Sequence, residues 1–167
     1  MTGARLTEVE LPDFGMPASM PVIPEAVYQD RIERFRKRAS DGGFDRVVVY
    51  ADREHSANLS YLTGFDPRFE EALLVVGHAD EPAILVGNEC WGIAGAAPIP
   101  MRRHLYQDFS LPSQPRDRSL PLGEILGQEG FGAGSRVGVV GWKMLGDKRA
   151  IDLPAFIVDE LRLLTGP

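Results

Sequence analysis

The sequence predicts an α/β fold, with a mixed sheet of five to six strands and helices on both faces, in a three-layer α/β/α arrangement. Residues 46–50 contain three consecutive valines and residues 72–76 are all apolar, which is typical of strands covered on both sides. Residues 28–39 and 153–164 instead repeat apolar side chains every three to four positions, which predicts helices with one buried face. A short polar connection from 72–76 to 83–86 predicts an antiparallel hairpin, so a mixed sheet is expected.

Length and composition restrict the class of protein. At 167 residues the chain suits one domain with a hydrophobic core, and 44% hydrophobic with 25% charged residues is ordinary globular usage. No apolar run is long enough to cross a membrane, so no membrane partner is expected. Residues 1–20 lack the basic start and apolar middle of a secretory signal, which favours a cytoplasmic protein. The net charge of −6 disfavours nucleic acid, whose phosphates demand a basic surface.

The chain divides into an arm and a domain. Residues 1–23 are rich in proline and methionine without a clear period, which predicts an extended N-terminal arm that can drape over a partner subunit. The α/β domain is expected at residues 24–167. Its first helix begins after Pro24 and stops at the Asp-Gly-Gly of residues 41–43. The arginine-rich run 31–38 within it fits a solvated helix face better than an anion-binding face.

The strand at 46–50 is expected to lie at the centre of the sheet. Residues 52–55 follow at its end, where open α/β sheets place ligands. His55 lies there, but it has no second histidine or cysteine at ligand spacing, so a surface-loop position is the alternative to a site.

Residues 58–76 organise the rest of the chain. Leu59 and Leu62 can pack one face of a helical turn onto the core, and Gly64 can end that turn in the left-handed conformation. Phe65 is placed for the hydrophobic contact that such caps use. The loop 66–71 then lies between this corner and a buried strand, and loops on rigid supports are where binding residues concentrate.

The later elements follow from similar patterns. Asn88 is expected to cap a short helix reaching residue 97, and Ser119 to cap another ending near residue 130. Alternation over 102–109 predicts a half-exposed strand near the sheet edge, and 136–140 predicts a further strand. The helix at 153–164 is expected to bury one face formed by Phe156, Ile157, Leu161 and Leu164.

No hydrolytic motif is complete in the sequence. Gly-x-Ser-x-Gly and His-Glu-x-x-His are both missing, and histidines at 55, 78 and 104 form no ligand cluster. Glu70 and Glu71 are adjacent on an extended segment, so they are expected to point to opposite faces rather than act as a pair. The single cysteine, Cys90, fits a packed, inert thiol better than a nucleophile. The chain alone is therefore not expected to be an enzyme or to hold a cofactor.

The pattern Asn-x-x-Tyr-Leu-Thr-Gly-Phe, carried by Asn58, Tyr61, Gly64 and Phe65 and followed by an apolar strand, resembles the N-terminal domain of the creatinase, prolidase and Xaa-Pro aminopeptidase family. The order of neighbouring elements extends the resemblance over most of the chain. It implies a sheet of ribonuclease-H-like topology. It also implies that a catalytic pita-bread domain, with two divalent metal ions (Mn, Co or Zn), is absent from this chain, so a fragment is expected.

The resemblance implies a role as well. We expect a homodimer in which this domain helps dimerisation and caps the partner subunit's active site, where the parent enzyme hydrolyses Xaa-Pro peptides or a small guanidino compound. Substrate contact across the dimer is expected from Arg68, Phe69, Glu70 and His55. Arginine suits a carboxylate through two parallel hydrogen bonds. The alternative for the loop is a solvated Arg68 over a packed Phe69.

Two other classes of protein are compatible with the fold. The same fold can serve as a free-standing binding or scaffold module without hydrolase activity, because fold does not fix function. A nuclease of ribonuclease-H-like topology is disfavoured by the acidic charge and by the lack of a basic stripe.

Overall fold

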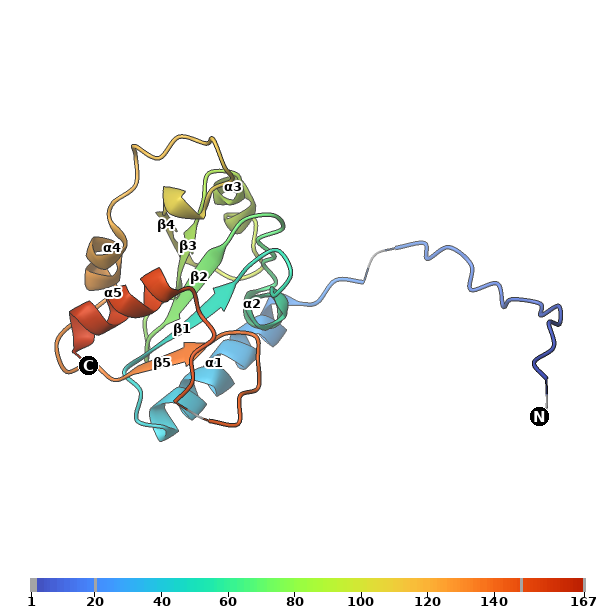
Figure 1. Cartoon of the computed structure of the whole chain (residues 1–167), viewed down its shortest axis with the longest axis horizontal. Coiled ribbons are helices and arrows are strands. Elements are labelled where there is room, and N and C mark those ends of the chain that lie inside the picture. The colour runs from blue at the N-terminus through green and yellow to red at the C-terminus, as the bar shows by residue number, and fades with distance from the viewer. Residues whose placement is uncertain (1–2, 20, 148, 167) are drawn as a thin grey trace.

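The computed structural model describes residues 3–19, 21–147 and 149–166, and five strands within them form one sheet. The strands are β1 (Arg46–Ala51), β2 (Ala72–Val76), β3 (Ala83–Val86), β4 (Arg102–Leu105) and β5 (Val137–Val140). Their order is β4-β3-β2-β1-β5 (Figure 1). β1 is antiparallel to β2 and β2 to β3, whereas β1 with β5 and β3 with β4 are parallel. The mixed sheet and the hairpin predicted from the sequence are confirmed.

The sheet centre differs from the prediction. β1 pairs on both sides, but β2 is the middle strand of the five. All five residues of β2 are buried, in keeping with its unbroken apolar sequence.

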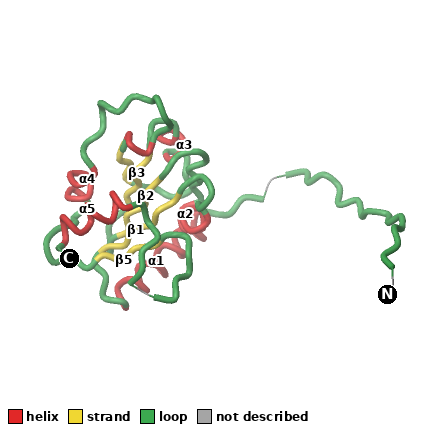
Figure 2. The backbone as a smooth tube through the Cα atoms, viewed as in Figure 1, coloured by secondary structure: helices red, strands yellow, loops and turns green. Residues whose placement is uncertain are grey.

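Helices cover both faces of the sheet, as expected (Figure 2). One face packs against α1 (Glu25–Asp41), α2 (Ala57–Thr63) and α3 (Cys90–Ala94). The other face packs against the short 3₁₀ helix η1 (Gln107–Phe109), α4 (Leu122–Gln128) and α5 (Ala155–Thr165). Alternate strand residues supply each face, so Val49 and Leu74 join the first core and Val48 and Leu73 the second. None of the described helices is long and apolar enough to span a membrane.

The segment ahead of α1 has no helix or strand in residues 3–19 and 21–23, and its side chains are exposed. Figure 1 shows it running away from the domain. The hydrophobic core begins at Tyr28 in α1. Predictions for residues 1, 2 and 20 of the arm, and for 148 and 167 of the domain, lie outside the described residues.

Two predicted caps are wrong. The Asn88 side chain does not cap α3; its amide donates to the Pro115 carbonyl and its oxygen accepts from Gln107. α3 is also shorter than expected and ends at Ala94. The Ser119 hydroxyl accepts the backbone N–H of Gln107, and α4 begins only after Pro121. Both polar side chains instead accept hydrogen bonds from Gln107, because this buried residue needs partners for its polar groups.

The predicted edge strand is shorter than its alternating pattern. β4 ends at Leu105, and the chain turns into η1 instead of continuing to residue 109. Gln107 and Phe109 are both buried in that turn. In α5 the buried residues are Ile157, Val158 and Leu161, whereas Phe156 is 45% exposed, so its predicted burial is wrong.

Candidate functional site

Three loops that are far apart in sequence lie together at one end of the strands β1, β2 and β3. Ala51 at the end of β1 pairs with Ala72 at the start of β2, and Ala72 pairs with Val86 at the end of β3. The segments 52–55, 66–71 and 87–89 therefore leave the sheet side by side. The predicted site residues lie on the first two of these segments.

The helix α2 and its glycine corner set the direction of the loop 66–71. Gly64 has φ of +72°, ends α2 in the left-handed conformation and donates its N–H to the Ser60 carbonyl. A side chain there would meet the Pro98 ring at 2.7 Å, so the corner requires glycine for space as well as for conformation. Phe65 follows and is buried in the core. The left-handed cap and the buried phenylalanine expected from the sequence are both confirmed.

The two polar members of the motif face outward. The Asn58 amide donates to the Gly141 carbonyl at 2.7 Å, which joins α2 to the segment that follows β5. Tyr61 is exposed, its carbonyl accepts a hydrogen bond from Arg31 at 2.8 Å, and the Arg31 guanidinium lies 4.2 Å from its ring centroid. Asn58 therefore joins α2 to the segment after β5, and Tyr61 joins α2 to α1.

The loop 66–71 holds Arg68 outward. The Asp66 carboxylate accepts the Arg68 N–H at 2.9 Å, and Arg68 has φ of +62°, a left-handed conformation that is uncommon outside glycine. Its side chain is exposed, and so is 47% of Phe69. The Pro67 carbonyl accepts hydrogen bonds from the Glu70 N–H and from the Cys90 thiol. The loop therefore exposes the Arg68 guanidinium and the Phe69 ring to solvent, and the residues beneath them are buried.

Glu70 is one of the buried residues beneath the loop, with only 3% of its surface exposed. Its carboxylate accepts the backbone N–H groups of Glu89 at 3.2 Å and Cys90 at 2.8 Å. Burial, followed by a hydrogen bond with the Glu89 carboxylate, raises the pKa of Glu70 to about 7. A protonated Glu70 can donate to that neighbour, whose Oε2 is otherwise buried without a partner among the described residues. Glu70 therefore holds the loop to the start of α3.

Glu71 points the other way, as expected for adjacent residues on an extended segment. Its carboxylate accepts the Tyr50 hydroxyl at 2.7 Å, and burial raises its pKa above the usual range. Burial and the hydrogen bond to Glu71 also raise the pKa of Tyr50.

His55 lies at the end of β1 in a network of its own. Its Nδ1 is 2.9 Å from Asp52, and its ring stacks on Trp142 with centroids 4.3 Å apart. Burial raises the pKa of Asp52, but hydrogen bonds from the His55 ring and from the N–H groups of Glu54 and His55 outweigh it and lower the pKa overall. Trp142 was not anticipated from the sequence, because nothing local in either segment signals the contact between them.

A cavity of about 230 Å³ opens between the loops, lined in part by Asp52, Phe69, Glu70, Glu71 and Ser110. Two predicted site residues, Phe69 and Glu70, meet there, whereas Arg68 and His55 are not part of its lining. No group of three or more His, Cys, Asp or Glu side chains in the described ranges is arranged to hold a metal ion. The cavity lining combines acidic residues with Arg53, and the exposed Arg68 offers a guanidinium to an anionic group.

Cys90 contributes no chemistry to this site. Its side chain is buried, and burial together with the nearby Glu70 raises the pKa of the thiol to about 12. The prediction of a packed thiol is confirmed.

Solved structures with the same fold include peptidases and isolated peptidase domains. Dipeptidase PepE from Mycobacterium ulcerans is similar over 86% of this chain, with 16% identity and a TM-score of 0.59, and this chain covers 34% of its length. The Creatinase/Prolidase N-terminal domain of an X-Pro dipeptidase from Streptococcus pyogenes gives 17% identity and a TM-score of 0.56, covering 81% of this chain and 88% of that domain. A proline dipeptidase from Streptococcus agalactiae gives 18% identity and a TM-score of 0.51, covering 82% of this chain and 88% of that one.

No curated protein matches the sequence. The family model of the Creatinase/Prolidase N-terminal domain matches residues 31–139, which include the sheet from β1 to β4, the glycine corner and the loop 66–71. The fold and this match agree, and the chain belongs to the creatinase/prolidase N-terminal domain family.

Proposed function

We propose that this chain is the non-catalytic N-terminal domain of a metallopeptidase-like hydrolase, which dimerises and uses the loop 66–71 to cap the partner subunit's active site. The family match supports membership in such an enzyme. The coverage supports it too, because the chain spans 34% of the dipeptidase from M. ulcerans but most of the isolated domain from S. pyogenes.

The observation that carries the capping role is the outward placement of Arg68. Its backbone has the left-handed conformation, and Asp66 on one side and the buried Glu70 on the other fix the loop around it. Such strain persists only where the surrounding structure imposes it, and it is a common feature of binding sites. An exposed Phe69 beside it adds apolar surface that a purely solvated loop does not need.

The proposed substrate is an Xaa-Pro peptide. Arg68 suits the carboxylate of such a peptide through two parallel charge-assisted hydrogen bonds. Two of the similar structures are an X-Pro and a proline dipeptidase, which favours a peptide over a guanidino compound. The hydrolytic step and its divalent metal ions, Mn, Co or Zn, belong in this proposal to the catalytic domain, and the residues of this chain bind and orient the substrate.

Kinetics of Arg68 variants in the complete protein test the proposal. Arg68→Gly removes the guanidinium and suits the left-handed backbone, whereas Arg68→Ala removes the same group and keeps the strain. Both should lower kcat/KM by about 10- to 100-fold, the equivalent of about 1.5 to 3 kcal/mol for a lost charged hydrogen bond. Arg118→Ala is the matched control on an exposed loop. If both Arg68 variants keep the kinetics of the control, Arg68 is a solvated side chain and the capping role fails.

A further inference from the structure

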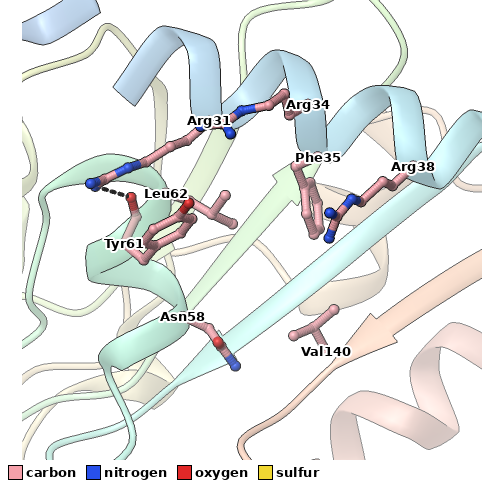
Figure 3. Close-up of a pocket in the computed structure, with 8 residues that line it drawn as sticks. All are labelled: Arg31, Arg34, Phe35, Arg38, Asn58, Tyr61, Leu62 and Val140. Atoms are coloured by element: carbon pink, nitrogen blue, oxygen red, sulfur yellow. Dashed lines mark hydrogen bonds between the residues drawn. The ribbon is translucent and has the colours of Figure 1, made fainter. Parts of the chain in front are cut away.

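A groove of about 250 Å³ lies between α1 and α2, on the α1 side of the sheet. Phe35, Leu62 and Val140 supply apolar side chains to it (Figure 3). Arg31 and Arg38 are also among its lining residues. The face that the sequence assigned to solvent therefore borders a hollow with an apolar lining and a cationic rim.

The charges of this rim are poorly neutralised. Arg31 is held against Tyr61 by a hydrogen bond to its carbonyl and by stacking on its ring, but neither contact removes the positive charge. Arg34 pairs with Asp30 at 2.6 Å, and both side chains are mostly exposed. Arg38 has no carboxylate within 4.0 Å among the described residues. In a chain with a net charge of −6, this groove is therefore a local concentration of positive charge.

The arm ahead of α1 has the complementary chemistry. Glu8, Glu10 and Asp13 are acidic and alternate with or adjoin exposed apolar residues. The largest of these apolar side chains, Phe14, is 91% exposed. Figure 1 shows the arm leading away from the α/β domain. Several apolar side chains in one exposed, acidic segment indicate a segment that docks on another surface.

We propose that the groove between α1 and α2 holds the segment 8–14 of the N-terminal arm of a second copy of this chain, with Phe14 against the apolar lining and the carboxylates near the arginines. Because each copy carries one arm and one groove, two copies can exchange their arms reciprocally and form a symmetric pair. This exchange of arms needs neither a catalytic domain nor the loop 66–71.

Titration with a peptide tests the pairing directly. The probe is a fluorescein-labelled peptide of residues 6–16, and the receptor is the full chain whose own arm carries Glu8→Lys, Glu10→Lys, Asp13→Lys and Phe14→Ser, so that it does not compete. Fluorescence anisotropy should show saturable binding that weakens as salt is raised. Arg38→Glu in the receptor should weaken binding at least about tenfold, because it replaces attraction by repulsion.

Matched controls separate the groove from general attraction of charges. Arg118→Glu makes the same charge change on the loop before α4 and should leave the affinity unchanged. A scrambled peptide of identical composition should bind at least about tenfold more weakly, because register matters in an apolar groove. Absence of binding, equal binding of the scrambled peptide, or equal effects of the two arginine changes would each overturn the proposal.

Sedimentation velocity of the unmodified chain tests the second copy. A concentration-dependent dimer is expected, and both the four-residue arm variant and Arg38→Glu should shift it toward monomer. A chain that stays monomeric at all concentrations while the peptide binds would mean that each arm docks on its own domain, which contradicts exchange between copies.

Discussion

The Glu70 carboxylate accepts the backbone N–H of Cys90 at 2.8 Å, and this contact fastens the loop 66–71 to the start of α3. The Cys90 thiol returns a hydrogen bond to the Pro67 carbonyl at 2.9 Å, so the two segments are joined twice. Because Glu70 and Cys90 are buried and these hydrogen bonds join their two segments, they set the positions of Arg68 and Phe69 on the outer side of the loop. Changes at Glu70 should therefore alter both stability and loop geometry.

Stability should depend on the protonation of Glu70. Its pKa is raised to about 7, so the folded state favours the protonated form. This contribution is fully present below its ordinary pKa of 4.5 and is lost as the pH rises through 7, by at most about 3 kcal/mol. Urea unfolding between pH 5 and 8 should show a decline in unfolding free energy that Glu70→Gln flattens. Glu124→Gln, an exposed control, should keep the decline; an equal slope in the wild type and the Glu70 variant would refute this assignment.

Glu129 should show the opposite pH dependence. Burial raises its pKa, but hydrogen bonds from Arg102 and His104 outweigh that effect and lower the pKa overall. A lowered pKa stabilises the folded state above the ordinary value of 4.5, and this contribution is lost as the pH falls through the folded pKa. Glu129→Gln should cost about 1 to 3 kcal/mol of unfolding free energy at pH 6.5, and this cost should shrink as the pH falls below 4.5. A cost independent of pH would point to lost packing instead.

The glycine corner should not tolerate a side chain. In Gly64→Ala the new methyl group would lie 2.7 Å from the Pro98 ring and 2.9 Å from Tyr28, at a φ of +72°. We expect a loss of at least about 1 to 2 kcal/mol in thermal or chemical unfolding. Gly127→Ala in α4 is the matched control, because nothing lies within 4 Å and a helical alanine is favoured there by about 0.5 to 1 kcal/mol. If the two changes alter the free energy of unfolding equally, the left-handed cap does not require glycine at position 64.

The fold was predictable where a local pattern determines the structure. The apolar runs of β1 and β2, the period of α1 and the cap at Gly64 are all properties of neighbouring residues, and the structure confirms them. Errors occurred where a polar side chain had several possible partners. Asn88 and Ser119 suit helix caps in sequence, but both are used by Gln107, a buried amide that needs its hydrogen bonds satisfied.

The candidate site was predictable only in outline. The sequence identified the loop 66–71 as a segment between rigid supports, and the structure places it at the sheet edge. The sequence alone groups Glu70 with Arg68 and Phe69, yet Glu70 lies beneath them because Cys90, distant in sequence, donates a hydrogen bond to its carboxylate. The stacking of Trp142 on His55 also joins distant segments and leaves no local signal.

Mixing two impaired variants of the complete protein shows whether Arg68 of one chain serves the active site of the partner subunit. One carries Arg68→Ala with its metal ligands intact, and the other keeps Arg68 but has lost one metal ligand. In a mixed dimer, action across the interface rebuilds one complete site from Arg68 of one chain and the metal site of the other. Random exchange makes about half of all dimers mixed, so activity should recover to about a quarter of the wild-type value. Activity that stays at the average of the two variants after exchange would contradict the account.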